Sequence, residues 1–212
     1  MSTASDARFW DRTSRKYATA AIADRVGYER TLDRTRALMG PRARVLELGC
    51  GTGTTALLLA GDVKSYLATD ISSEMIAIAE VKHAVDPKPG LSFRTATAET
   101  LEPGVGQFDA VLGFNYLHLV RDLPGTLRRI HGLLAADGLF ISKTPCVGEM
   151  NLLIRLALLP AMRAIGKAPY ANVFRVAELS QFLSAAGFDI LATEAHATKA
   201  NEARPYIVAR KR

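Results

Sequence analysis

The chain has 212 residues, 49% of them hydrophobic and 23% charged, which is typical of one soluble globular domain. Its first residues lack the apolar stretch of a secretory signal. The sequence also contains no run of about 18 apolar residues, the length that spans a bilayer. We therefore expect a single cytoplasmic domain over residues 1–212. The net charge of +6 comes from scattered Lys and Arg residues, which favours a solvated basic surface over a specific site for nucleic acid, anionic lipid or an anionic substrate. Cys50 and Cys146 lack metal-site spacing, so we expect two reduced thiols and no metal.

The first 40 residues form a section of their own. Apolar residues such as Trp10 and Tyr17 are interspersed with charges, and this pattern predicts a helix over 6–39 that a Gly-Pro pair ends. We interpret 1–40 as an N-terminal helical cap on the domain.

Short apolar runs then alternate with helical patterns. Repeated strand–helix units of this length predict a parallel sheet covered by helices on both faces. The predicted strands are 44–48, 64–69, 91–97, 108–114 and 139–143, and the helices between them are 54–60, 73–85 and 123–135.

The C-terminal part departs from this alternation. Residues 147–176 contain an apolar run, 152–165, whose only charges are basic. A helix over 178–186 and two strands, 188–193 and 206–209, follow. The polar segment between these strands predicts an antiparallel hairpin.

A glycine-rich loop joins the first strand to its helix. Residues 49–53 read Gly-Cys-Gly-Thr-Gly, and a helix N-terminus after such a loop offers free N–H groups to a ligand that approaches the backbone closely. A dinucleotide site would have a third glycine where this chain has Thr54. Asp70 ends the second strand, 21 residues after Gly49, where a carboxylate can accept both hydroxyls of a ribose. A helix cap or a surface acid is the alternative role.

Together these motifs resemble those of class I S-adenosylmethionine (SAM)-dependent methyltransferases. The run 45–53, Val-Leu-Glu-Leu-Gly-Cys-Gly-Thr-Gly, closely resembles the first motif of the family, and Asp70 resembles its ribose ligand. Four later segments resemble, in the order of the family, the stretch whose Met packs on adenine (73–76), the contact to the adenine amino group (97–99), the lining of the methionine end (108–118) and the fifth strand (138–142).

The resemblance covers roughly 41–145 and 180–210 and implies an α/β, Rossmann-like, doubly wound sheet of seven strands. The last strand would be antiparallel, with helices on both faces. It also implies SAM as the methyl donor and S-adenosylhomocysteine (SAH) as the product. Two of the implied cofactor contacts have an alternative. Met75 could be a plain core residue instead of an adenine contact, and Glu99 could be a solvated acid. The implied cofactor-binding residues are Glu47, Gly49, Cys50, Gly51, Gly53, Thr54, Asp70, Ile71, Met75, Ala98, Glu99, Phe114 and Asn115.

The chemistry of methyl transfer points to few catalytic residues, because the acceptor needs mainly alignment and exclusion of water. A general base matters only for an acceptor that arrives protonated. His118 can take such a proton or hold the acceptor, or it simply caps the turn around it. Tyr17 resembles the tyrosine that covers SAM in several small-molecule enzymes, with plain helix packing as the alternative. Candidate residues of the acceptor pocket are Tyr28, Tyr116, Lys143, Tyr170 and Phe174.

Some acceptors are disfavoured by motif. Residues 114–117, Phe-Asn-Tyr-Leu, lack the prolines of enzymes that methylate amino groups of DNA bases. Pro145-Cys146 matches the dipeptide of pyrimidine C5 enzymes but follows the fifth strand and lacks the rest of their pattern. We therefore expect a small or lipid-like acceptor rather than nucleic acid.

Segment 147–176 leaves three roles open: a packing helix, a lid over a lipophilic substrate, or a helix on an anionic membrane surface. With the N-terminal cap, it loosely resembles small-molecule methyltransferases, including quinone-biosynthesis and bacterial phospholipid enzymes. The main hypothesis is a SAM-dependent methyltransferase of a small or lipid-like acceptor. The alternatives are a phospholipid N-methyltransferase at the membrane surface and a non-catalytic SAM-binding protein.

Overall fold

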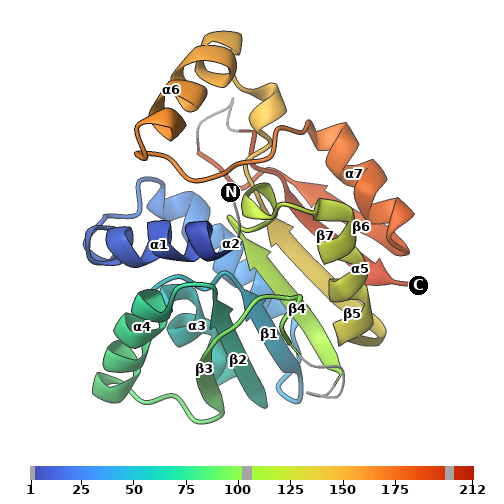
Figure 1. The fold of residues 1–212 in the computed structure, drawn as a ribbon. Coiled ribbons are helices and arrows are strands. Elements are labelled where there is room, and N and C mark those ends of the chain that lie inside the picture. Colours follow the sequence, from blue (N-terminus) through green and yellow to red (C-terminus); the bar gives the residue numbers. More distant parts are fainter. Residues whose placement is uncertain (1–2, 102–106, 199–202) are drawn as a thin grey trace.

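The computed structural model describes residues 3–101, 107–198 and 203–212, apart from the side chains of residues 154 and 155. Seven strands form one sheet (Figure 1). They are β1 (Arg44–Leu48), β2 (Ser65–Asp70), β3 (Leu91–Thr95), β4 (Phe108–Phe114), β5 (Leu134–Lys143), β6 (Phe188–Glu194) and β7 (Tyr206–Lys211).

The strand order is β3-β2-β1-β4-β5-β7-β6. Strands β1 to β5 pair in parallel, whereas β7 runs antiparallel to both β5 and β6. The predicted seven-stranded sheet with an antiparallel last strand is confirmed. The order reverses between β1 and β4, and ligands of such sheets bind beyond the carboxyl ends of the strands at this switch point.

Helices cover both faces of the sheet. One buried core includes Leu127 and Leu183 from helices on one face, and a second includes Leu32 and Leu59 from helices on the other. Among the described residues, no helix is long and apolar enough to cross a membrane. The helices are α1 (Thr3–Ala18), α2 (Arg25–Leu38), α3 (Thr54–Leu59), α4 (Ser73–Val85), α5 (Leu123–Leu133), α6 (Leu159–Ala164) and α7 (Val176–Ala185), with short turns η1 (Ala60–Asp62), η2 (Leu117–Leu119), η3 (Val147–Glu149) and η4 (Ile154–Leu158).

Two predicted boundaries are wrong. The single helix predicted over 6–39 is two helices, because the carboxylate of Asp24 accepts the backbone N–H of Gly27 at 3.0 Å and begins α2 as its N-cap. Strand β5 begins at Leu134 rather than at 139. Asp137, with φ of 59°, lies where the pairing of β5 with β4 shifts register, so the chain passes through a bulge there and the strand starts earlier.

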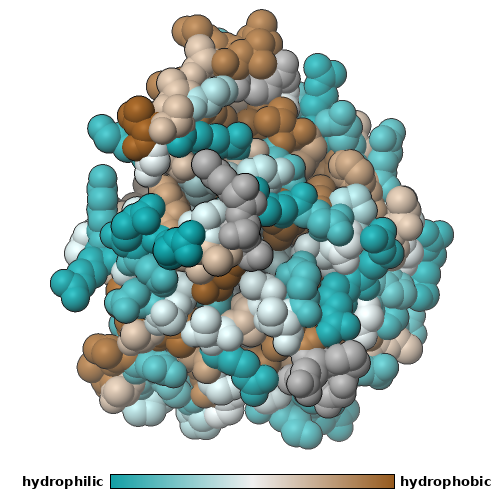
Figure 2. Space-filling view, viewed as in Figure 1, coloured by the Kyte–Doolittle hydropathy of each residue, from teal (hydrophilic) through white to brown (hydrophobic). Residues whose placement is uncertain are grey.

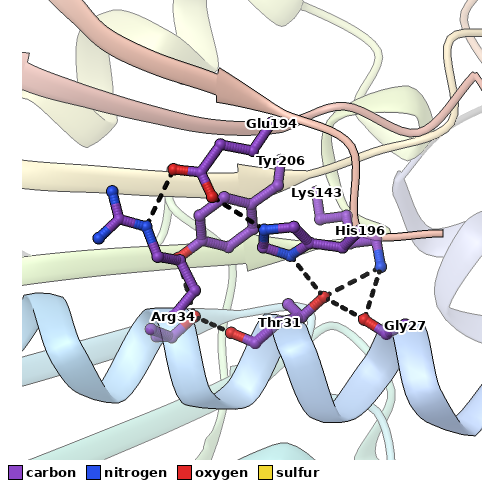
Figure 3. Close-up of polar contacts among 8 residues, drawn as sticks. Gly27, Thr31, Arg34, Lys143, Glu194, His196 and Tyr206 are labelled. Atoms are coloured by element: carbon purple, nitrogen blue, oxygen red, sulfur yellow. Dashed lines mark hydrogen bonds and ion pairs between the residues drawn. The ribbon is translucent and has the colours of Figure 1, made fainter.

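A polar network fastens α2 to the C-terminal hairpin (Figure 3). The hydroxyl of Thr31 lies 3.1 Å from Nδ1 of His196, and the ammonium of Lys143 donates to that hydroxyl at 3.0 Å. On its other side, Nε2 of His196 lies 3.0 Å from the Glu194 carboxylate, which also accepts from Arg34 at 2.9 Å. The network therefore joins three elements far apart in sequence, α2, β5 and β6.

Thr31→Val should lower the free energy of unfolding by about 1–3 kcal/mol, because Lys143 and His196 both lose a hydrogen-bond partner in the interior. Denaturant unfolding measures the change. The control is Thr19→Val, which alters an exposed hydroxyl at the end of α1. Equal stability of Thr31→Val and the wild type would show that the network contributes nothing.

Candidate functional site

A cavity of about 790 Å³ lies at the carboxyl ends of β1, β2 and β4, at the switch point of the sheet. Its wall includes Gly51 of the glycine loop, Asp70 at the end of β2, Asn115 after β4 and Trp10 of α1. The described residues contain no group of three or more His, Cys, Asp or Glu residues that could hold a metal ion. Sheet topology and the N-terminal helix together define this site.

The glycine loop takes a conformation that needs its glycines. Gly49, Gly51 and Gly53 have φ of 71°, 54° and 74°, in the left-handed region that side chains disfavour. A Cβ on Gly49 would lie 2.9 Å from the Tyr116 ring, and one on Gly51 would lie 3.3 Å from the Tyr17 ring. The bare backbone therefore lets both rings pack closely against the loop at the edge of the cavity.

Lys82 fastens the loop from α4, and nothing in the sequence analysis indicated it. Its ammonium donates to the carbonyl oxygen of Thr52 at 3.0 Å and to the hydroxyl of Thr52 at 2.9 Å. A lysine in the last turn of a helix is an ordinary residue, and only the fold brings it to a loop 30 positions earlier.

Asp70 is buried at the edge of the cavity with its carboxylate already oriented. One oxygen accepts the N–H of Gly51 and the other accepts the N–H of Ser72, both at 2.9 Å. Ser72, not Asp70, is the N-cap of α4, since its hydroxyl accepts from Met75 N at 3.1 Å. Burial raises the pKa of Asp70 and these N–H groups oppose the rise. The carboxylate keeps lone pairs that can face a ribose.

Glu47 lies behind the loop rather than in the cavity wall. Its carboxyl group is buried in β1 and accepts a hydrogen bond from the Tyr66 hydroxyl at 2.9 Å. Burial raises the pKa of Glu47 to about 7. The neighbouring Cys50 thiol is also buried, and burial raises its pKa well above the usual range, so it stays a neutral thiol.

The expected adenine side is built by α4, the segment after β3, and α5. Met75 and Ile71 line the cavity, as does Glu99, whose carboxylate accepts from the Thr126 hydroxyl at 2.5 Å. Ala98 is buried behind the wall, where its carbonyl accepts from Arg129 at 3.1 Å. Thr126 and Arg129 come from α5, and no local motif marks them.

His118 contributes its ring to the cavity wall and carries one buried, unsatisfied polar atom. The ring lines the cavity, and its Nδ1 atom is buried without a hydrogen-bond partner in the described part of the chain. Burial, with the nearby Arg204, lowers the pKa of His118 to about 4. The imidazole is therefore neutral at pH 7 and suited to hydrogen-bond an acceptor, whereas a group of such low pKa is an inefficient proton acceptor.

The other candidate residues separate into two groups. Tyr17, Phe114, Asn115 and Tyr116 line the cavity with the residues above. The remainder lie outside its lining in the described structure. Gly53 and Thr54 begin α3, Tyr28 bonds to Thr55, Lys143 bonds to Thr31, Phe174 is buried in the core, and Tyr170 stacks on Arg121.

Comparison with known proteins defines the class. A family model described as a methyltransferase domain matches residues 15–193, so the chain belongs to the methyltransferase family. The fold is that of magnesium protoporphyrin IX methyltransferase from Synechocystis PCC 6803, crystallised with SAH. The TM-score is 0.74 at 19% identity, and the match covers 99% of both chains. The glycine loop, Asp70 and the cavity beside them suit SAM, the cofactor of this family.

Two curated relatives are named for different reactions. The mitochondrial arginine-hydroxylase of Danio rerio is 32% identical over 161 residues, 74% of this chain and 48% of that protein. The ubiquinone biosynthesis O-methyltransferase of Ruegeria pomeroyi is 31% identical over 128 residues, 60% of this chain and 50% of that protein. The chain thus spans about half the length of these two relatives.

The buried Glu47 should make stability fall with rising pH. The folded protein holds the proton of Glu47 up to about pH 7, whereas the unfolded chain releases it near pH 4.5. The stability that this proton contributes is complete below pH 4.5 and is lost as the pH rises through 7, by about 3 kcal/mol.

Glu47→Gln should abolish this fall, and denaturant unfolding at pH 5 and pH 8 measures it. Glu80→Gln, which changes an exposed acid on α4, should follow the wild type. Parallel pH profiles for Glu47→Gln and the wild type would contradict the assignment.

Proposed function

We propose that this domain transfers the methyl group of SAM to a small or lipid-like acceptor. One observation carries the proposal: a positive-φ glycine loop and the oriented Asp70 carboxylate border one cavity. That arrangement occurs in a chain of the methyltransferase family. An exposed backbone and a ribose-binding acid are the two features that a nucleoside cofactor at this edge requires.

The residues would divide the work as follows. SAM supplies, when bound, a methyl group on a sulfonium centre, which is a good leaving group. The loop 49–53 and Asp70 hold the cofactor, while Trp10 and Tyr17 of α1 keep water from the reacting groups. Neutral His118 holds the acceptor through its ring, which lines the cavity. Alignment and desolvation, rather than proton transfer by a strong base, then supply most of the rate.

The acceptor would have an apolar body with one polar group. The cavity wall beyond the cofactor residues is largely apolar, and the neutral His118 side chain adds a polar ring to it. That end of the wall includes Ala7, Leu119, Val120 and Pro145. A lipophilic hydroxyl or amine compound fits these surroundings, and the name of the ubiquinone biosynthesis O-methyltransferase relative agrees with such an acceptor.

Peripheral membrane contact is part of the same proposal. Figure 2 shows hydrophobic residues gathered around α6, where Leu153 is 72% and Leu156 is 64% exposed. No acidic residue occurs between positions 150 and 177, whereas Arg163 and Lys167 are basic. An apolar surface with only positive charges is complementary to an anionic lipid surface. The segment 147–176 would thereby bring the cavity to a membrane-dissolved acceptor.

A second candidate function is SAM binding without methyl transfer. The relative named as an arginine-hydroxylase favours keeping it, because that name describes a different reaction on a similar chain. Incubation with labelled SAM and a lipid and metabolite extract separates the two. Labelled product together with SAH supports methyl transfer, whereas SAM binding without either supports the second candidate.

Asp70→Ala should weaken SAM binding at least tenfold, because each hydrogen bond to a charged group contributes about 1.5–3 kcal/mol. Titration calorimetry measures the dissociation constant. Asp70→Asn keeps one acceptor oxygen, so its dissociation constant for SAM should lie between those of the wild type and Asp70→Ala. Asp189→Ala, which removes an exposed acid paired with Arg212, is the control. Unchanged affinity in a folded Asp70→Ala variant would refute the ribose role.

Vesicle flotation tests the membrane contact. The protein should float with vesicles of anionic phospholipid and remain behind with zwitterionic vesicles. The double variant Leu153→Ser/Leu156→Ser should lose flotation, while Val81→Ser/Val85→Ser should keep it although those two α4 residues are 67% and 84% exposed. Absence of wild-type flotation would refute membrane contact and leave a soluble acceptor.

A further inference from the structure

The segment between β4 and α5 connects the two parts of the chain that cover the cavity. Helix α1 contributes Trp10 and Tyr17 to the cavity wall. Segment 147–176 lies against the same opening, where Asn172 N donates to the carbonyl of His118 at 2.6 Å and its side-chain amide donates to the carbonyl of Val120 at 2.5 Å. In Figure 1, α1 and α6 both lie beyond the carboxyl ends of the parallel strands.

Arg121 contacts both covers at once. Its Nε and Nη2 atoms donate to the two carboxylate oxygens of Asp6 in α1, at 2.7 and 2.8 Å. The face of the same guanidinium lies 4.5 Å from the centre of the Tyr170 ring, and Arg163 of α6 lies 5.5 Å from that centre. A two-pronged ion pair and a stacked ring are both geometries that arginine forms and lysine does not.

The ion pair between Arg121 and Asp6 holds α1 in place and lies outside the buried core clusters. Asp6 is 17% and Arg121 is 30% exposed, so solvent screens the pair less than at an open surface. Arg121 also lines the cavity, and hydrogen bonding to Asp6 raises its pKa, so the guanidinium stays charged. Asp11 is a second polar anchor of α1, since its carboxylate accepts from the Ser72 hydroxyl at 2.7 Å.

We infer that Arg121 is a positioning residue that closes the cavity, by fixing α1 on one side and segment 147–176 on the other. The inference rests on the proposed function for its consequence: an open α1 lets the cofactor and water exchange. Breaking the Arg121–Asp6 pair should free the first turns of α1 while the sheet stays folded, because neither residue belongs to a buried core cluster.

The chain contains its own probe of closure. Trp10 is the only tryptophan, it lies on α1 one turn after Asp6, and it lines the cavity. Quenching of its fluorescence by acrylamide therefore reports how open α1 is, without any ligand. Arg121→Gln should at least double the quenching constant, with little change in the unfolding midpoint. Raised salt should increase quenching of the wild type but not of Arg121→Gln.

Charge exchange distinguishes closure from general damage. Asp6→Arg alone places two guanidinium groups together and should be the most open variant. Asp6→Arg/Arg121→Asp restores an ion pair and should recover much of the wild-type quenching, although it loses the stacking on Tyr170. Arg25→Gln, which breaks an exposed ion pair with Glu29 on α2, is the matched control.

The release rate of bound SAH gives the second readout, and Arg121→Gln should release it about two- to fivefold faster. Wild-type quenching and release rate in folded Arg121→Gln would overturn the inference. If Arg121→Gln does not fold, Asp6→Asn tests the same contact from α1. Failure of the wild type to bind SAH would refute the proposed function, and quenching of the unliganded protein would still decide whether Arg121 closes the cavity.

Discussion

The site depends on a sharp turn at the end of β1, where the chain passes from a buried strand into α3 within five residues. Only glycine takes the left-handed conformation at three of those positions without strain, and the absence of side chains lets the Tyr116 and Tyr17 rings approach. The turn also aims the N–H of Gly51 at Asp70. One constraint on backbone conformation thus fixes both the bare surface of the loop and the orientation of the carboxylate.

The glycine loop and its carboxylate could be predicted from short stretches of sequence. Strand, glycine loop and helix are adjacent in the chain, and Asp70 follows at the end of the next strand. A local pattern therefore contains the information that positions them. Two predictions from local sequence were wrong, the single helix over 6–39 and the start of β5. Asp24 caps a second helix inside a segment whose polarity resembles one long helix, and Asp137 adopts a left-handed conformation within β5.

The contacts that shape the rest of the site join residues far apart in the chain. Lys82 reaches back 30 positions to the loop, and Arg121 lies 115 positions from Asp6. Neither Lys82 nor Arg121 lies in a recognisable sequence motif, so the sequence alone does not indicate these contacts. The same holds for Lys143, which was expected in the acceptor pocket. It lies instead in the network of Thr31 and His196, 53 positions before that histidine.

We propose that the glycine loop and Asp70 bind SAM, and a crystal structure of the protein grown with SAH tests this most directly. We predict that the ribose hydroxyls lie within hydrogen-bonding distance of the Asp70 carboxylate, with the ligand against the backbone of 49–53. Ordered SAH at another site, or with its ribose away from Asp70, would contradict the central claim.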